Sequence, residues 1–117
     1  MKEFLLLFRG NDAEQMQLSP EEREAFMKRW QQWIGDIAQK EQLVGAHPLE
    51  REGKVMRGAY KKLTDGPYME GKEVLGGYVL LKVKDVDEAI KVSEGCPILE
   101  MESGTVEIRE IGTKSAM

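Results

Sequence analysis

The sequence has one cysteine and one histidine, and these shortages exclude several kinds of site. A lone cysteine, Cys96, cannot form a disulfide within the chain. His47 has no second histidine or paired cysteine at the spacing that zinc ligands need. We therefore expect neither a disulfide framework nor a metal site, and nothing in the sequence indicates a cofactor.

Long apolar runs and an excess of basic residues are also missing. The apolar run near the N-terminus, Phe4–Phe8, is shorter than the roughly 7–15 residues of a signal peptide's core and the ~18 of a membrane span. The net charge is −4, and the basic residues are scattered among acidic neighbours. A nucleic-acid-binding protein normally presents a basic face to the phosphates. We expect a cytoplasmic protein that binds neither a membrane nor a nucleic acid.

The length and composition are those of an ordinary globular protein. The chain has 117 residues, of which 41% are hydrophobic and 32% charged. Single domains commonly contain about 100–200 residues, and this composition is not that of a disordered chain. We expect residues 1–117 to form one domain.

Two segments, Phe4–Phe8 and Leu75–Val83, read as strands that are apolar on both faces. The predicted faces are Phe4, Leu6 and Phe8 against Leu5 and Leu7 in the first strand, and Leu75, Val79, Leu81 and Val83 against Tyr78 and Leu80 in the second. The turn-forming residues Gly10–Asp12 follow the first strand. A strand that is apolar on both faces has to be covered on both.

Two helices are predicted from their starting signals. Ser19 and Glu22 form a capping box, which predicts a helix from Pro20 to about Glu41. Its apolar stripe consists of Phe26, Trp30, Trp33, Ile34 and Ile37. Tryptophans on such a stripe favour core packing, with a ligand-binding box as the alternative. Asp85 is the cap of a second, short helix, which Gly95 and Pro97 end.

The remaining segments give weaker or shorter signals. Val44–Leu49 is predicted to be extended because it contains Pro48, and the residue before a proline avoids the helical conformation. Val55–Arg57 and Lys61–Leu63 indicate short edge strands or a hairpin, since their polarity is mixed. Thr105–Ile111 alternates as a strand covered on one face does, and Gly112–Met117 is expected to fray.

The element order predicts an α+β fold. A β-α-β-β-α-β order is that of the ferredoxin-like arrangement, with an antiparallel sheet and both helices on one face. The two-faced strands then need a second cover, and a second copy packed sheet against sheet supplies it. We therefore expect a homodimer, a dimeric α/β-barrel. A cavity between the sheets, or between sheet and loop, would be the natural ligand site.

The segment Thr64–Tyr78 carries a specific motif. It reads TDGPYMEGKEVLGGY and resembles the signature of YCII-related proteins of the DGPF type, approximately T-D-G-P-F-x-E-x-K-E-x-L-G-G-Y. Tyr68 stands where the family usually has phenylalanine. The flanking segments agree with this family along nearly the whole chain. The resemblance implies the dimeric α/β-barrel fold and no settled activity.

One family feature is missing. Members of the wider YCII family carry a His/Asp pair that resembles an acid/base pair, with the histidine near the start of the first helix. The matching stretch here, Ser19–Phe26, has no histidine. The pair is therefore not carried over to this chain.

The candidate catalytic residues are Asp65 and His47. Asp65 would lie at the mouth of the intersheet cavity, where partial desolvation raises a carboxyl pKa toward neutrality. The alternative is structural, because Asp65-Gly66-Pro67 is also a stable turn sequence. His47 is considered because histidine is the side-chain type suited to proton transfer near physiological pH, but an exposed loop histidine is the simpler interpretation.

The candidate ligand-binding residues follow in the same motif. Tyr68 could direct its hydroxyl into the cavity or cap the core with its ring. Glu70, Lys72 and Glu73 could bind a polar ligand, or form the weak ion pairs of a solvated loop. Gly76-Gly77 indicates a close approach of backbone to a subunit or a ligand.

Two functional hypotheses remain open. In the first, a YCII-like homodimer binds a small organic molecule in the barrel cavity, with lyase- or isomerase-type proton chemistry led by Asp65. In the second, the chain is a non-catalytic regulatory or partner-binding dimer. A polar, ligand-sized pocket containing Asp65 would favour the first, and a cavity filled by side chains the second.

Overall fold

The computed structural model describes residues 1–70 and 73–112. Its elements are β1 (Lys2–Asn11), α1 (Asp12–Met16), α2 (Pro20–Gln39), β2 (Leu43–Pro48), β3 (Lys54–Arg57), β4 (Lys62–Asp65), β5 (Met69–Glu70), β6 (Glu73–Val83), α3 (Val86–Glu94), the 3-10 turn η1 (Pro97–Glu100) and β7 (Thr105–Glu110). Five strands form one antiparallel sheet with the order β2-β6-β1-β7, in which β5 also pairs with β6. The strands β3 and β4 form a two-stranded sheet of their own.

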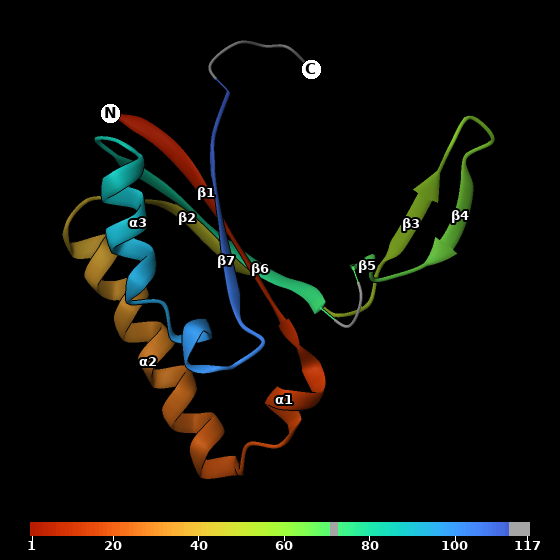
Figure 1. Ribbon diagram of the computed structural model, residues 1–117, viewed down its shortest axis with the longest axis horizontal. Coiled ribbons are helices and arrows are strands. Elements are labelled where there is room, and N and C mark those ends of the chain that lie inside the picture. The colour runs from red at the N-terminus through yellow and green to blue at the C-terminus, as the bar shows by residue number, and fades with distance from the viewer. Residues whose placement is uncertain (71–72, 113–117) are drawn as a thin grey trace.

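This topology confirms the predicted fold class. If β1, β2, β6 and β7 are taken as the four strands of the β-α-β-β-α-β order, their arrangement in the sheet is the ferredoxin-like one. Figure 1 views the sheet nearly edge-on, with α2 and α3 on one side and the β3–β4 hairpin projecting on the other. The molecule measures 45 × 45 × 19 Å along its principal axes. None of the described helices is long and apolar enough to cross a membrane.

The core lies between the helices and one face of the sheet. Alternate residues of β1 point into it, and Phe4 and Leu6 are almost completely buried. Val79, Leu81 and Val83 of β6 lie beside them, and Trp33 and Ile37 of α2 cover them. We call the opposite face, which no described helix covers, the open face; Leu5, Leu7, Tyr78 and Leu80 lie there, half-buried.

Both predicted helix starts are confirmed. The Ser19 hydroxyl accepts a hydrogen bond from the Glu22 N–H (3.1 Å), and the Glu22 carboxylate accepts one from the Ser19 N–H (3.0 Å). These two bonds are the capping box that the sequence predicts. Asp85 accepts a hydrogen bond from the Glu88 N–H (2.9 Å) at the start of α3.

The turn predicted at Gly10–Asp12 is wrong. The strand β1 continues to Asn11, because β6 offers it partners as far as Glu73. The side chain of Asn11 then accepts a hydrogen bond from the Ala13 N–H (2.9 Å) and caps the short helix α1. Asparagine thus begins a helix here, which is one of its two common roles, rather than a turn.

A β-bulge changes the predicted face of Leu75. Phe8 pairs with Gly77 but Arg9 pairs with Leu75, so Gly76 is an extra residue in β6. An extra residue breaks the two-residue period of a strand. Leu75 therefore shares the open face with Arg9. The sequence had predicted it on the opposite face, beside Val79.

One edge strand of the sheet is β2, and the segments Val55–Arg57 and Lys61–Leu63 do not belong to this sheet. Leu43–Pro48, which the sequence predicts only as extended from Val44, pairs with β6. Of the two alternatives for Val55–Arg57 and Lys61–Leu63, the hairpin is observed. The predicted fraying of Gly112–Met117 concerns residues that, after Gly112, lie outside the described part of the chain.

We predict that Gly104→Ala destabilises the fold. An added Cβ at Gly104 would lie 1.9 Å from the Ile98 carbonyl oxygen, so the turn before β7 would have to shift. We expect the free energy of unfolding, measured by urea denaturation, to fall by about 1–3 kcal/mol or more. Gly35→Ala is the control: nothing lies within 4 Å of its added Cβ, and alanine should stabilise α2 by up to ~1 kcal/mol. Equal stability of the Gly104 variant and wild type would contradict the prediction.

Candidate functional site

A cavity of about 790 Å³ lies between α2 and the end of the sheet formed by β1, β2 and β6. Ligand pockets commonly enclose about 300–1,000 Å³. We call this space the α2 cavity. It differs from the predicted site, which was expected between two sheets or between sheet and loop.

The inner wall of the α2 cavity is apolar and aromatic. Phe26, Trp30 and Ile34 come from α2, at the spacing that puts them on one side of a helix, and Phe8 comes from β1. The Trp30 ring meets Phe8 edge to face at 5.1 Å between centroids, and Phe26 at 6.3 Å. This wall suits a flat apolar molecule, because aromatic rings offer large contact area in fixed orientations.

The two tryptophans of α2 have different roles in the structure. Trp33 is buried in the core, and its indole N–H donates to the Val92 carbonyl oxygen at 3.0 Å. Trp30 is only partly buried and lines the α2 cavity. Core packing therefore holds for Trp33, and Trp30 packs against the core while also forming a cavity wall.

The rim of the cavity is polar. His47 of β2 lies opposite Tyr78 of β6, with ring centroids 5.7 Å apart and planes tilted by 54°. Arg9 of β1 also lines the cavity, and its guanidinium donates to the Glu107 carboxylate at 2.6 Å. Arg51 completes this side. The rim thus combines a group that can transfer protons, His47, with cationic groups that can attract an anion.

Gly77 allows β2 to approach β6 at this rim. A Cβ on Gly77 would lie 3.1 Å from the His47 carbonyl oxygen. The Leu49 N–H donates to the Gly76 carbonyl oxygen at 2.9 Å, which holds the chain beside the bulge. The close backbone approach predicted for Gly76-Gly77 is therefore an approach of the edge strand of the same chain.

The far end of the cavity is held by α1. The N–H and hydroxyl groups of Ser103 donate to the Glu14 carboxylate at 3.1 and 2.9 Å, and these bonds lower the pKa of Glu14. The Ser103 hydroxyl also accepts a hydrogen bond from the Asn11 N–H at 3.0 Å. These bonds fix α1, so Gln15 and Gly10 line the cavity.

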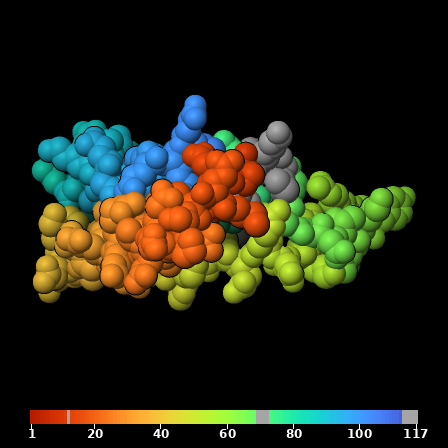
Figure 2. Space-filling view, turned by 90° about the horizontal axis from the view of Figure 1, so that it is seen from below, coloured from red at the N-terminus to blue at the C-terminus, as the bar shows by residue number. Residues whose placement is uncertain are grey.

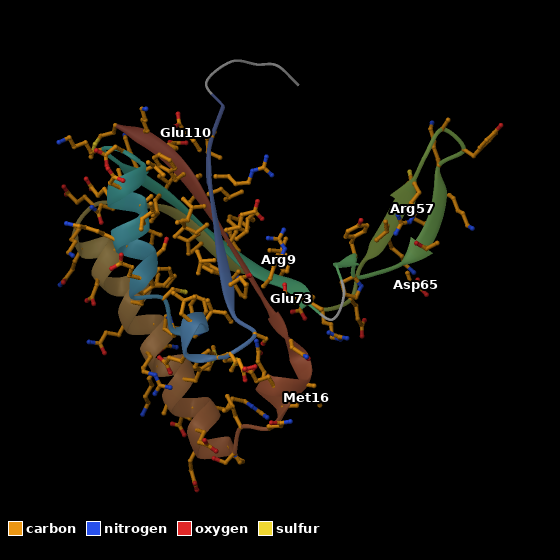
Figure 3. All side chains as sticks on the ribbon, in the orientation of Figure 1. Arg9, Met16, Arg57, Asp65, Glu73 and Glu110 are labelled. Atoms are coloured by element: carbon orange, nitrogen blue, oxygen red, sulfur yellow. The ribbon has the colours of Figure 1, made fainter. Side chains whose placement is uncertain are left out.

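Of the two predicted catalytic residues, only His47 lines the α2 cavity. Asp65 belongs to β4 on the projecting hairpin, where its side chain is 84% exposed and pairs with Lys54. Figure 3 shows Asp65 on the hairpin, away from Arg9 and Glu73 at the end of the sheet. The single chain therefore does not bring Asp65 and His47 together.

Of the predicted ligand-binding residues, Tyr68 and Glu73 are not among the described residues that line this cavity. The Tyr68 ring is 59% exposed and packs under the Arg57 guanidinium, 5.3 Å away. Glu73 begins β6, directly before the lining residue Val74, and its backbone is the strand partner of Glu70 in β5. Lys72 lies outside the described residues.

Sequence reasoning did not identify Phe8, Arg9, Arg51 or Tyr78 as site residues. Phe8 and Tyr78 looked like ordinary strand residues, and nothing in the sequence indicated that β2 ends beside the Gly76 bulge. The signal that could have indicated this cavity was the spacing of the tryptophans in α2, for which a ligand-binding box was the alternative interpretation. Trp30 lines the cavity.

Cys96 is not placed for nucleophilic chemistry. It is 2% exposed, and burial raises the pKa of its thiol to about 12. The described residues contain no group of three or more His, Cys, Asp or Glu side chains that could hold a metal ion.

Comparisons with known proteins give one family. The model of the YCII-related domain matches residues 3–113. No curated protein matches the chain. Among solved structures, the chain is similar to 5-chloro-2-hydroxyhydroquinone dehydrochlorinase from Burkholderia phenoliruptrix AC1100 in complex with 2,5-dihydroxybenzoquinone. The two are 14% identical with a TM-score of 0.49, and the match covers 90% of each chain.

We predict that the Cys96 thiol is unreactive in the folded protein. A thiol with a pKa of about 12 is almost entirely protonated at pH 8, and the thiolate is the reactive form. Native protein at pH 8 should therefore react with Ellman's reagent no faster than it unfolds. Protein in concentrated urea is the control and should release one equivalent of thionitrobenzoate at once. Rapid reaction of the native protein would show that Cys96 is accessible.

Proposed function

The chain belongs to the YCII-related domain family, and on that premise we propose that it binds a small organic molecule in the α2 cavity and acts as a homodimer. The observation that carries the binding proposal is the α2 cavity itself: about 790 Å³, walled by Phe8, Phe26 and Trp30 and rimmed by His47 and Arg9. A large apolar pocket with a few convergent polar groups is what a small-molecule site requires.

The wall and rim indicate the chemistry of the ligand. A flat apolar body would pack against Trp30 and Phe26, which already meet edge to face. A polar or anionic group on the same molecule would lie at the rim, near Arg9 and Arg51. The proposed ligand is therefore an aromatic or similarly flat molecule with one polar end.

Any reaction in this proposal is proton transfer of the lyase or isomerase type. His47 is the histidine at the rim, and its imidazole is the proposed general base and acid that takes a proton from the ligand and returns it. Asp65 stays a prediction: its carboxylate pairs with Lys54 on the hairpin, outside this cavity. The proposal therefore rests on His47.

The homodimer is proposed from the open face. Leu5, Leu7, Tyr78 and Leu80 lie half-buried on it, on the side of the sheet opposite α2 and α3. A soluble protein rarely leaves a continuous apolar patch of more than a few hundred Å² uncovered. Two open faces packed against each other would bury both patches in a two-fold dimer.

The alternative function is that of a non-catalytic regulatory or partner-binding dimer. The same open face favours it, since Leu5, Leu7 and Leu80 offer an apolar surface and do not line the α2 cavity. The two functions are separated by small-molecule binding in the α2 cavity. The single domain over residues 1–117 and the cytoplasmic location remain predictions.

We predict that Gly35→Leu abolishes binding of 1-anilinonaphthalene-8-sulfonate, an apolar aromatic probe with one anionic group. Gly35 lines the α2 cavity and nothing lies within 4 Å of an added Cβ, so there is room at this position for a larger side chain to begin. Wild type should enhance the probe's fluorescence with saturable binding, and Gly35→Leu should not. Retention of full binding by the variant would exclude the α2 cavity as the binding site.

Gln32→Leu is the matched control for this experiment. Gln32 lies on the same helix, is exposed and does not line the cavity. This variant adds the same side chain to α2 without filling the space, so it should bind the probe as wild type does. Absence of saturable binding to wild type would favour the non-catalytic function.

We also predict that Leu7→Lys converts a dimer into a monomer. Leu7 pairs with Tyr78 in the middle of the open face, and burial of an unpaired charge there is unfavourable. Sedimentation velocity at micromolar concentration should give a dimer for wild type and a monomer for the variant. Leu99→Lys, at a residue 48% exposed in η1, is the control and should remain a dimer. A monomeric wild-type protein would overturn the proposed dimer.

A further inference from the structure

The β3–β4 hairpin, Lys54–Asp65, projects from the body of the molecule, and we call it the arm. Its two strands pair with each other as a separate sheet. Figure 1 shows it beyond the end of β6 and on the side of the sheet opposite α2 and α3. The space-filling view in Figure 2 shows the same segment extending past the body at one end of the molecule. The arm thus lies on the side where the open face lies.

The arm has a defined internal structure. Lys54 and Asp65 form an ion pair at its base, and the Gly66 N–H donates to the Gly53 carbonyl oxygen at 2.6 Å. The Arg57 guanidinium packs over the Tyr68 ring. These contacts hold the hairpin in one shape, although little of it is buried.

The arm presents an apolar pair to solvent. Met56 and Leu63 are direct partners across the two strands, and their exposed fractions are 62% and 56%. Cross-strand partners point to the same face of a hairpin. A two-stranded hairpin is at best marginally stable in water unless something packs against it. This pair therefore indicates a contact that the single chain does not make.

The charge of the arm indicates what that contact is. The arm contains four basic residues, Lys54, Arg57, Lys61 and Lys62, and one acidic residue, Asp65, so its net charge is +3. The whole chain has a net charge of −4, so the rest of it carries −7. Opposite charges favour association of an arm with a body of this composition.

We propose that the arm of each chain clasps the body of a second copy in the homodimer. When two open faces meet, the arms, which lie on that same side, flank the opposite subunit. Met56 and Leu63 then pack against apolar surface of the second copy, and the basic residues of the arm lie beside its carboxylates. This inference rests on the proposed homodimer and identifies the arm as an element that holds its two subunits together.

The test is sedimentation equilibrium of Met56→Lys/Leu63→Lys. Placing two charges in the apolar contact should raise the dimer dissociation constant about tenfold or more, because two buried side chains are lost from the interface. The variant's far-UV circular dichroism should match wild type, since the arm lies outside the core. Val86→Lys/Ile90→Lys is the matched control: these α3 residues are 47% and 42% exposed, and the double change adds the same charge.

The outcomes separate the arm from the dimer. A wild-type dissociation constant for the arm variant, while Leu7→Lys is monomeric, would overturn the clasp and leave the dimer. Equal weakening by the control would also overturn it, since added charge alone would then explain the effect. A monomeric wild type would overturn both proposals.

A photo-cross-linking residue gives a second measurement. Benzoylphenylalanine at position 63 should cross-link to a second copy of the chain, and mass spectrometry should locate the product outside the arm. Cross-links that join arm to arm, or that stay within one chain, would contradict the clasp.

Discussion

The pairing of β1 with β6 is the interaction on which the rest of the structure depends. The two strands are partners from Lys2 and Val83 at one end to Asn11 and Glu73 at the other, and they form the centre of the sheet. Their helix-facing side chains make the core, and their other side chains make the open face. The single register shift in this pairing, at the Gly76 bulge, lies where the α2 cavity meets the sheet.

The bulge connects the fold to the candidate site. It turns Leu75 to the open face and leaves Gly77, which has no side chain, under the end of β2. The edge strand can therefore come close to β6, and this brings His47 opposite Tyr78. Beyond this point β2 ends and α2 continues, so Trp30 and Phe26 face a cavity, whereas Trp33 one turn later packs in the core. The bulge thus lies at the boundary between the core and the cavity.

The apolar wall of the α2 cavity and the open face lie on opposite sides of the same sheet, whereas the rim residues Arg9, His47 and Tyr78 are on the face of Leu7. The apolar part of the ligand would lie on the helix side, against Trp30, and its polar end would lie at the rim, while a second copy would cover the open face around Leu7. The two sites share Tyr78, but Leu7 does not line the cavity and Gly35 is on α2, away from the open face, so binding and dimerisation can be altered by separate substitutions. The arm adds a third surface, whose positive charge contrasts with the negative charge of the rest of the chain.

Local signals in the sequence determined the elements of this protein. The capping residues Ser19 and Asp85 begin helices as predicted because their bonds join groups three residues apart. The two-residue period of Phe4–Phe8 predicts the faces of β1, and the element order predicts the topology. The motif from Thr64 to Tyr78 indicates the family. What the tertiary structure alone decided is the site, because a cavity depends on where distant elements end beside one another. No local pattern specifies that β2 ends next to Gly77 or that the hairpin places Asp65 away from His47. The role of Asn11 as a helix cap likewise depends on the strand partners that β6 offers to the end of β1.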